Sequence, residues 1–461
     1  MTSILKKSAI ALACALLAAC SLTPDFHLPG VKTPEKWQQT ENAKAATDLM
    51  QWRKSFGNAE LAALQDKAVT QNLDMAAARA RVLQARGLVT TARSGLFPSL
   101  DAGGSIGATH NDASNAGTRN YTSAEAGLSV SYDADIFGGN SASVTAAKAR
   151  LEGSVFAQEA VRLAVESDIS SAYAAALTAQ ERIYVARSHL NNAENTLKVL
   201  QSTYEAGLST ALEPEQQKTA IASDRAALAA LERTRAISIS ALAVLMGEPA
   251  PGFNIYADGL KGFNVPDISP DAPATLITRR PDIRAAEADL IAANADIGAA
   301  RAAFLPALTL SGAASLAASP IYDPVSILAS ALASATAPIF DGGARKGALS
   351  VAKGREKELA ATYQKTVLTA FKEVQDALAG VKSAKLRQEA FAAAAASAAK
   401  AYNISEGRFK AGAIDYITVL DAERSLLFAR ENLELAKLER IDAAIDLYRA
   451  LGGGWEKPKV N

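Results

Sequence analysis

Two regions of the chain alternate apolar and polar side chains, and this period of two predicts β-strands. The run Leu128–Asp133 alternates in this way, and so does the run that starts at Leu308. Alternation over about nine residues indicates a strand with one apolar face and one polar face. We expect two hairpins, at about 99–136 and 307–339, although the strand from Ser99 is rich in glycine and alternates only weakly.

The predicted hairpins have polar tips at Asn111–Asn120 and Ser319–Asp323. The alternating runs suit the ~9–11 residues that a membrane-spanning strand requires. An antiparallel sheet packed on helices in a soluble protein would show the same alternation, so the pattern alone leaves both interpretations open.

A period of seven residues follows the first hairpin and predicts a long helix. Apolar side chains recur at Ile169, Ala176, Ile183, Leu190, Leu197 and Tyr204. Such a repeat implies coiled-coil packing, and the proline-free stretch at about 141–206 predicts one helix, ~100 Å long. A second long helix is expected at about 345–410. Return helices are expected at about 210–247 and 415–451, and lead-in helices at Ala59–Ser94 and Pro281–Ala303.

The chain is internally duplicated. Four short motifs recur in the same order about 205 residues apart; Tyr204–Gly207, for example, matches Phe409–Gly412. The repeat predicts two copies of one unit, at 57–248 and 274–461, joined by a proline-rich linker at 249–273. The glycine pairs Gly138-Gly139 and Gly342-Gly343 occupy matching places and predict bends from strand to helix.

Composition excludes several functions. The chain has 48 basic and 48 acidic residues, and this absence of net charge argues against a nucleic-acid-binding protein. It has three histidines, no Cys/His spacing typical of metal sites and no phosphate-binding loop. We therefore expect neither an enzyme nor a bound metal or cofactor.

The N-terminus predicts a signal peptide at residues 1–19, with Lys6 and Lys7 preceding a short apolar run. The run ends at Cys20, which small residues precede as in bacterial lipoproteins, so we expect a diacylglycerol and an N-acyl chain on Cys20. An ordinary signal peptide cut nearby is the alternative. Ser21 favours the outer membrane of a Gram-negative cell, and residues 20–56 are rich in proline and predict an extended tether and lead-in.

Four strands cannot close a membrane barrel, because the smallest have ~8 strands and open strand edges are not tolerated in lipid. If the strands span a membrane, several chains must pool them. The charged helices must lie in an aqueous compartment. The expected fold is an α+β membrane protein that forms an oligomeric tube, with a β-barrel in the outer membrane and a helical barrel in the periplasm.

Motifs along the whole mature chain resemble the outer-membrane efflux channels of the TolC type, and most closely their NodT-like lipoprotein branch. The resemblance rests on Cys20 with its proline-rich tail, Trp52–Asp74, Arg279–Ile283, Ala300–Pro306, Pro338–Gly343, Val419–Arg424 and Ala450–Trp455. It implies a homotrimer with a 12-stranded barrel, set in outer-membrane lipid. It also implies a periplasmic adaptor and an inner-membrane transporter of the resistance-nodulation-division type as partners.

The same resemblance places candidate functional residues at the two turns between long helices. Asp421 and Arg424 are the expected gate pair, three residues apart on one helix, with Asp415, Tyr416 and Ile417 one turn earlier. The family's second acidic ring would fall at a threonine here. We expect adaptor contacts at the tips, at Gly207, Leu208, Gly412 and Ala413. The alternative is that Asp421 and Arg424 form a solvated surface pair of little consequence.

The function predicted is passive export of small molecules, such as drugs, toxic compounds or metal ions, through a channel that adaptor docking opens. An outer-membrane channel for type I protein secretion is an alternative, although such channels usually lack a cysteine like Cys20. A lipid-anchored coiled-coil protein of the periplasm, without a pore, is a second alternative.

Overall fold

The computed structural model describes residues 22–38, 49, 52–113, 117–256, 259–260, 263–319 and 322–455. The signal peptide predicted at 1–19 and the lipidation site predicted at Cys20 lie outside the described residues. The chain forms two compact units. Among the described residues, unit 1 comprises those up to Gly30, Arg81–Val155 and Ala285–Lys365, and unit 2 comprises Val31–Ala80, Phe156–Arg284 and those from Thr366.

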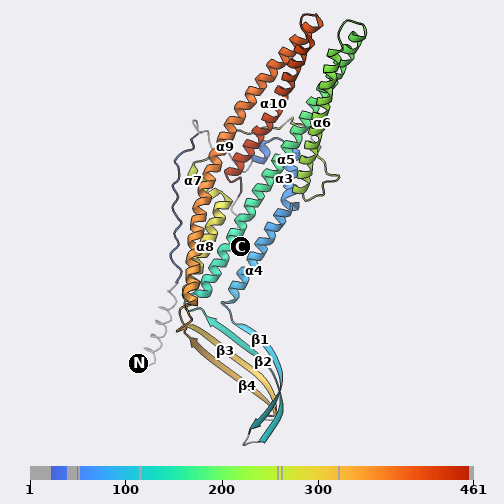
Figure 1. The fold of residues 1–461 in the computed structure, drawn as a ribbon. Helices are drawn as coiled ribbons and strands as arrows, with labels where there is room; N and C mark the ends of the chain where they lie inside the picture. The colour runs from blue at the N-terminus through green and yellow to red at the C-terminus, as the bar shows by residue number, and fades with distance from the viewer. Residues whose placement is uncertain are drawn as a thin grey trace. The chain divides into compact units, whose positions relative to one another are not determined.

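Unit 1 contains one antiparallel sheet of four strands in the order β1-β2-β3-β4 (Figure 1). The strands are β1 (Ser99–Ala113), β2 (Gly117–Ala134), β3 (Ala307–Ser319) and β4 (Tyr322–Thr336). The predicted tips were too long, because pairing continues to Ala113 opposite Gly117 and to Ser319 opposite Tyr322. Backbone pairing along the ladder outweighs the polar composition that suggested a wider loop.

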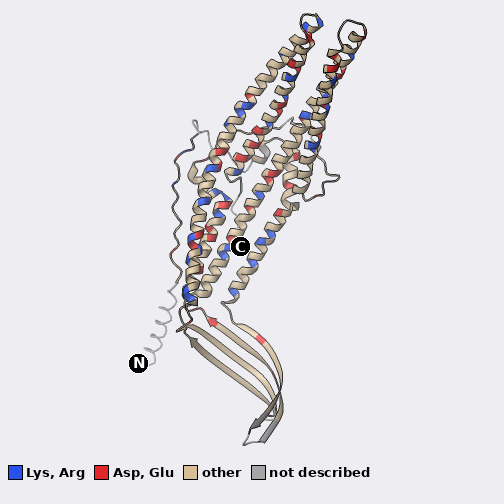
Figure 2. Ribbon diagram, in the orientation of Figure 1, with Lys and Arg blue, Asp and Glu red and all other residues tan. Residues whose placement is uncertain are grey.

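The pairing register divides the sheet into an apolar face and a polar face. Leu100 lies opposite Val130, and Leu316 lies opposite both Ala126 and Ile327, so side chains of one kind share a face across the strands. Leu100, Leu316 and Ile327 are exposed in the single chain. The other face carries Asp101, Ser129, Asp133 and Thr309, and the Thr309 hydroxyl donates to the Asp133 carboxylate at 2.7 Å. Figure 2 shows few charges on the strands and both signs along the helices.

At each of the two bends from strand to helix, an aspartate side chain caps the first turn of the long helix. The carboxylate of Asp135 accepts hydrogen bonds from the backbone N–H groups of Asn140 and Ser141, at 2.9 and 2.7 Å, at the start of α5 (Gly139–Glu205). Asp341 does the same for Gly343 and Arg345 at the start of α9 (Ala344–Lys410), at 2.9 and 3.1 Å. A carboxylate is favourable there because the first N–H groups of a helix lack partners.

Small side chains pack the helices of unit 1. Buried alanines of α5 and α8 (Pro281–Ala302) contact one another: Ala146, Ala149, Ala292 and Ala295. A second cluster joins Val82, Ala85 and Val89 to α5. A Cβ on Gly139 would lie 3.0 Å from that of Ala302, so a side chain at the second glycine of the first bend would crowd α8.

Unit 2 is helical. It includes α2 (Trp52–Ser55), α3 (Ala59–Gln71), α6 (Leu212–Leu245), α7 (Pro273–Arg279) and α10 (Tyr416–Ala450), together with parts of α4 (Leu73–Ser94), α5, α8 and α9. In Figure 1, α5 with α6 and α9 with α10 form two antiparallel hairpins. In the part of the chain that the structure describes, no helix is long and apolar enough to cross a membrane.

The lead-in helix predicted over Ala59–Ser94 is wrong in one respect, because it is broken at Asn72. This residue is extended, with φ −60° and ψ 134°, and separates α3 from α4. Its side chain accepts from the backbone N–H of Met75 at 3.0 Å and donates to the carbonyl of Leu245 at 2.8 Å. The side chain therefore begins α4 and anchors it to α6, and two hydrogen bonds offset the lost helical turn.

The predicted period of seven holds for only part of α5. Ile169, Ala176 and Ile183 are buried, but Tyr204 at the end of the series is 48% exposed. The buried positions shift to Ala186, Ala193 and Leu200. A straight α-helix drifts ~20° per seven residues, so one stripe cannot face the same neighbour along the whole length.

The two compact units are not the two sequence repeats. Each repeat supplies one hairpin to unit 1 and one pair of long antiparallel helices to unit 2. In each unit, one buried cluster joins helices of the two repeats.

Candidate functional site

Both helix hairpins turn at a glycine with the same local geometry. Gly207 has φ +72° and Gly412 has φ +69°, values that favour glycine. At the first tip, Gly207 N–H donates to the carbonyl of Tyr204 and Leu208 N–H to that of Thr203, at 2.9 and 3.0 Å.

The equivalent bonds at the second tip run from Gly412 to Phe409 and from Ala413 to Arg408, at 2.8 and 2.9 Å. Each tip is therefore a Schellman C-cap, which satisfies the last carbonyls of the long helix. Leu208 and Ala413 follow the glycines and are exposed, with Leu208 79% exposed.

Tyr416 joins the two hairpins of unit 2. It is 3% exposed, and its hydroxyl donates to Oε1 of Gln217 on α6 at 2.7 Å. Gln217 is fully buried, and its Nε2 donates to the carbonyl of Ala193 on α5 at 2.9 Å. An apolar cluster surrounds this network: Leu200, Val419 and Leu420, with Ala220, Tyr402, Phe409 and Ile414. Burial raises the pKa of Tyr416, so its hydroxyl stays a donor.

The other predicted gate residues lie at the surface of the single chain. Arg424 Nη1 and Asp421 Oδ1 are 3.9 Å apart on α10, and their side chains are 65% and 71% exposed. Asp415 occupies the N-cap position of α10, but its side chain makes no capping bond. Ile417 is 44% exposed. The structure thus brings Asp421 and Arg424 together, while Tyr416 forms a hydrogen bond with the other hairpin.

A buried polar cluster lies one to two turns from Tyr416. Nε2 of His189 on α5 is 3.1 Å from Oδ2 of Asp224 on α6, and its Nδ1 is 3.5 Å from Oε1 of Glu423 on α10. The three side chains are only 16%, 19% and 10% exposed. They line a cavity of 160 Å³ together with Gln217 and Arg424. One imidazole therefore contacts acids on two different helices.

The roles of Gln217, His189, Asp224 and Glu423 were not predicted from the sequence. A signal exists in the spacing of α10, where Tyr416, Val419, Glu423 and Leu426 follow the three-and-four spacing of a buried stripe. Glu423 is charged at a position where that stripe predicts an apolar residue. Such an exception indicates a buried partner, but the sequence does not reveal which residue it is.

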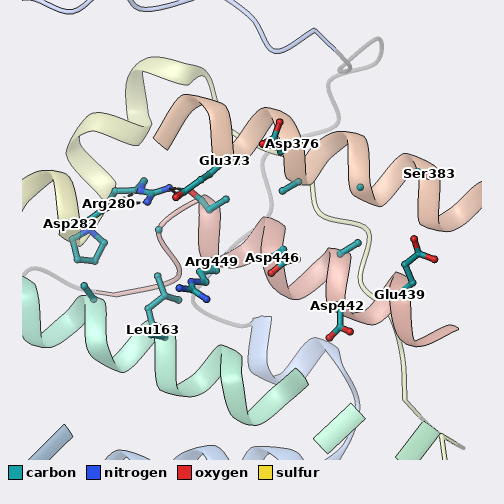
Figure 3. Close-up of a pocket in the computed structure, with 18 of the residues that line it drawn as sticks. Leu163, Arg280, Asp282, Glu373, Asp376, Ser383, Glu439, Asp442, Asp446 and Arg449 are labelled. Carbon is teal, nitrogen blue, oxygen red and sulfur yellow. Dashed lines mark hydrogen bonds and ion pairs between the residues drawn. The ribbon is translucent and has the colours of Figure 1, made fainter. Parts of the chain in front are cut away.

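A larger cavity of 860 Å³ lies elsewhere in unit 2, between α5, α9 and α10 (Figure 3). Arg280 lies at its edge with its side chain 9% exposed, bonded to Asp282 Oδ2 at 2.6 Å and Glu373 Oε2 at 2.7 Å. It also donates to the carbonyl of Ala450 at 3.0 Å. Arg280 therefore ties the start of α8 to α9 and to the end of α10.

Carboxylates dominate the lining of this cavity. They are Asp282, Glu373, Asp376, Glu439, Asp442 and Asp446, against the two cations Arg280 and Arg449. Oδ1 of Asp442 is buried and has no hydrogen-bond partner among the described residues. Burial raises the pKa of Asp442 to about 6, and the charge of Asp446 adds to this effect while a hydrogen bond with Ser171 opposes it. Among the described residues, no group of three or more His, Cys, Asp or Glu side chains could hold a metal ion.

The fold is similar to the folds of solved membrane proteins. A membrane protein from Pseudomonas aeruginosa has a TM-score of 0.88 and 30% identity, over 96% of this chain and 99% of that chain. The transmembrane channel protein CusC has a TM-score of 0.84 and 29% identity, over 94% of this chain and 100% of the CusC chain. The open-state outer-membrane channel MtrE of Neisseria gonorrhoeae has a TM-score of 0.84 and 28% identity, over 96% of this chain and 100% of the MtrE chain.

Curated relatives carry names that specify export. The pyoverdine export outer membrane protein OpmQ of Pseudomonas aeruginosa is 34% identical, covering 99% of this chain and 98% of OpmQ. The toluene efflux pump outer membrane protein TtgI of Pseudomonas putida is 31% identical, and the match covers 95% of this chain and 96% of TtgI. The family model described as "Outer membrane efflux protein" matches residues 64–248 and 272–453, which correspond to the two sequence repeats. This chain belongs to the outer membrane efflux protein family.

Proposed function

We propose that the chain is the outer-membrane exit duct of a tripartite efflux system and conducts small molecules passively from periplasm to exterior. One observation carries the proposal: within the described sheet, one face is apolar, the other is largely polar apart from Leu328 and Leu332, and the outer strands β1 and β4 each pair on one side only. A sheet of this kind suits a wall between lipid and water once its edges are paired with other copies.

Three copies would supply twelve strands and close the wall as a barrel, above the ~8 strands of the smallest membrane barrels. The helices would then form a helical barrel in the periplasm. The apolar side chains Leu100, Leu316 and Ile327, exposed in one chain, would face lipid, and Asp101 and Asp133 would face the aqueous lumen. A homotrimer thus gives the exposed apolar side chains of this face a suitable environment.

The exported compounds are small molecules in this proposal, because the relatives are named for pyoverdine, solvents and toluene. Protein secretion is not favoured, since none of these relatives is named for it. The duct needs no catalytic group. A lumen that holds no tight binding site lets a compound leave as readily as it enters.

Gating would take place at the two helix tips of unit 2. Tyr416 with Gln217 joins the hairpins, and three copies of Asp421 would form a charged ring that Arg424 partly neutralises. The exposed tip residues Leu208 and Ala413 are suited to contact a periplasmic adaptor, coupled to an inner-membrane transporter. Docking would open the duct if the adaptor binds the separated hairpins more tightly than the joined ones.

Lipid on Cys20 would anchor the tether to the membrane. The first described residues of the tether belong to unit 1 and contact α8, where Arg301 donates to the carbonyl of Leu22 at 3.0 Å and Asn294 to that of Pro24 at 2.8 Å. Labelling cells with palmitate should mark the protein, and Cys20→Ser should remove the label.

Planar-bilayer recording of the purified full chain tests the duct directly. We expect discrete conductance steps without nucleotide or ion gradients as an energy source. Protein that forms no steps, in bilayers where a porin control conducts, would contradict the proposal.

A further inference from the structure

His189 lies where three helices meet, and each of its ring nitrogens faces an acid on a different helix. Nε2 faces Asp224 on α6 at 3.1 Å, and Nδ1 faces Glu423 on α10 at 3.5 Å. The α5–α6 hairpin and α10 are therefore linked through a single imidazole. The link lies close to the Tyr416–Gln217 bond, and Leu420 and Gln217 line the same cavity.

A neutral imidazole has one N–H and one lone pair, whereas the imidazolium has two N–H groups. Only the protonated ring can donate towards both carboxylates at once. When the proton leaves, one nitrogen turns a lone pair towards a carboxylate, and Asp224 and Glu423 face each other across a neutral ring. The simultaneous contact of His189 with both acids therefore depends on one proton.

The groups around His189 hold that proton. Burial alone would lower the pKa of His189, but the hydrogen bond with Asp224 and the charges of Glu423 and Asp224 outweigh it, and the pKa is raised; Arg430 on α10 opposes the shift. Burial raises the pKa of Glu423, as do Asp224 and Glu406 on α9, while His189 and Arg424 lower it. Tyr402 on α9 feels the charge of Glu423 but stays neutral, because burial raises its pKa.

The sign of the pH dependence follows from these shifts. A raised pKa means that the stabilisation by His189 is complete below its unfolded value of 6.5 and is lost as the pH rises through the folded value. On the acid side, Glu423 gains a proton as the pH falls through its own raised pKa, and its attraction to His189 ends. The link is therefore strongest at mildly acidic pH.

We propose that His189 is a proton-operated tie, which holds the α5–α6 hairpin to α10 at mildly acidic pH and releases it as the pH rises. This inference rests on the proposed function, since it makes the periplasmic end of the duct respond to pH. Protonation adds a closing contact between the same helices that Tyr416 joins, and its loss leaves two acids that repel each other.

The test is single-channel recording of the purified full chain in planar bilayers from pH about 5.5 to about 8.5, a range that spans histidine titration. We expect the wild-type open probability to rise at least about twofold across this range. His189→Gln, which keeps a donor but cannot gain a proton, should remove the pH dependence and keep the high-pH open probability throughout. His110→Gln is the control, because His110 lies exposed on β1 and should leave the pH dependence unchanged.

Two results would overturn the inference and leave the proposed function standing: conduction without pH dependence in wild type, or a pH dependence that His189→Gln retains. Absence of conduction at every pH would overturn both. A second readout does not need a channel. The midpoint of thermal unfolding of His189→Gln should fall below that of wild type near pH 6 and approach it near pH 8.5; an equal difference at both values would contradict the tie.

Discussion

The hydroxyl of Tyr416 on α10 donates a hydrogen bond to Gln217 on α6 at 2.7 Å, with both side chains almost wholly buried. Tyr416→Phe would leave Oε1 of Gln217 without a donor in an apolar cluster. We expect a loss of about 1–3 kcal/mol in stability, because a buried acceptor left unpaired keeps its desolvation cost. Thermal unfolding measures this loss, and bilayer recording should show a higher open probability.

Tyr204→Phe is the matched control, because Tyr204 is 48% exposed near the other tip. It should change neither quantity. If Tyr416→Phe and Tyr204→Phe behave alike, the bond does not hold the hairpins together.

Removal of the surface pair on α10 should change conduction without changing stability. Asp421 and Arg424 are exposed and 3.9 Å apart, so their mutual attraction contributes little to the folded chain. If three copies of Asp421 form a ring, Asp421→Ala combined with Arg424→Ala should raise single-channel conductance. Replacing Arg355 and Glu358 by alanine removes another exposed pair, 2.6 Å apart on α9, and should have no effect. Equal conductance in wild type and the α10 variant would exclude these residues from the gate.

The raised pKa of Asp442 implies that the difference in stability between wild type and an Asp442→Asn variant depends on pH. Burial raises the pKa of this acid from 3.8 to about 6, so ionisation costs stability, and the cost grows as the pH rises from 3.8 through 6. Asp442→Asn should therefore raise the unfolding free energy at pH about 7.5, by on the order of 2 kcal/mol, with little change near pH 4. Denaturant titrations at the two pH values measure both numbers, and a gain of equal size at both would refute the assignment.

The second hairpin tip depends on Gly412. Its φ of +69° is strained for any residue with a Cβ, so Gly412→Ala should cost about 1–3 kcal/mol. Gly407 is the control, because it lies within α9 without a positive φ and has open space where a methyl group would lie. Gly407→Ala should be neutral or slightly stabilising, since alanine is the better helix former. Similar unfolding midpoints for the two variants would show that the tip tolerates other turns.

The elements that follow from local rules could be predicted from the sequence. Alternation located β2 and β3, and glycine located both helix tips and both strand-to-helix bends. Asn72 could not be predicted as a break, because its extended backbone depends on a bond to the distant Leu245. The drift of buried positions along α5 depends in the same way on which helix lies beside each turn.

The residues of the candidate site could likewise be predicted only in part from the sequence. Family resemblance indicated Tyr416, Asp421 and Arg424, but the partner Gln217 lies 199 residues from Tyr416. His189 and Glu423 come from different repeats, and only the packing of α5 against α10 shows that they meet. Pairwise contacts between distant segments are a property of the fold that one sequence does not display.

Several copies of this chain close the sheet into one wall in the proposed duct, and cross-linking of the sheet edges tests this most directly. Leu100 on β1 and Ala335 on β4 lie near the helical ends of the two edge strands. A series of cysteine pairs around these positions, made with Cys20 retained, should yield dimers and then covalent trimers in membranes, all reversed by a reductant. Single substitutions on one edge should yield no trimer. Monomers alone, or a ladder that continues beyond three chains, would contradict closure of the sheet by three copies.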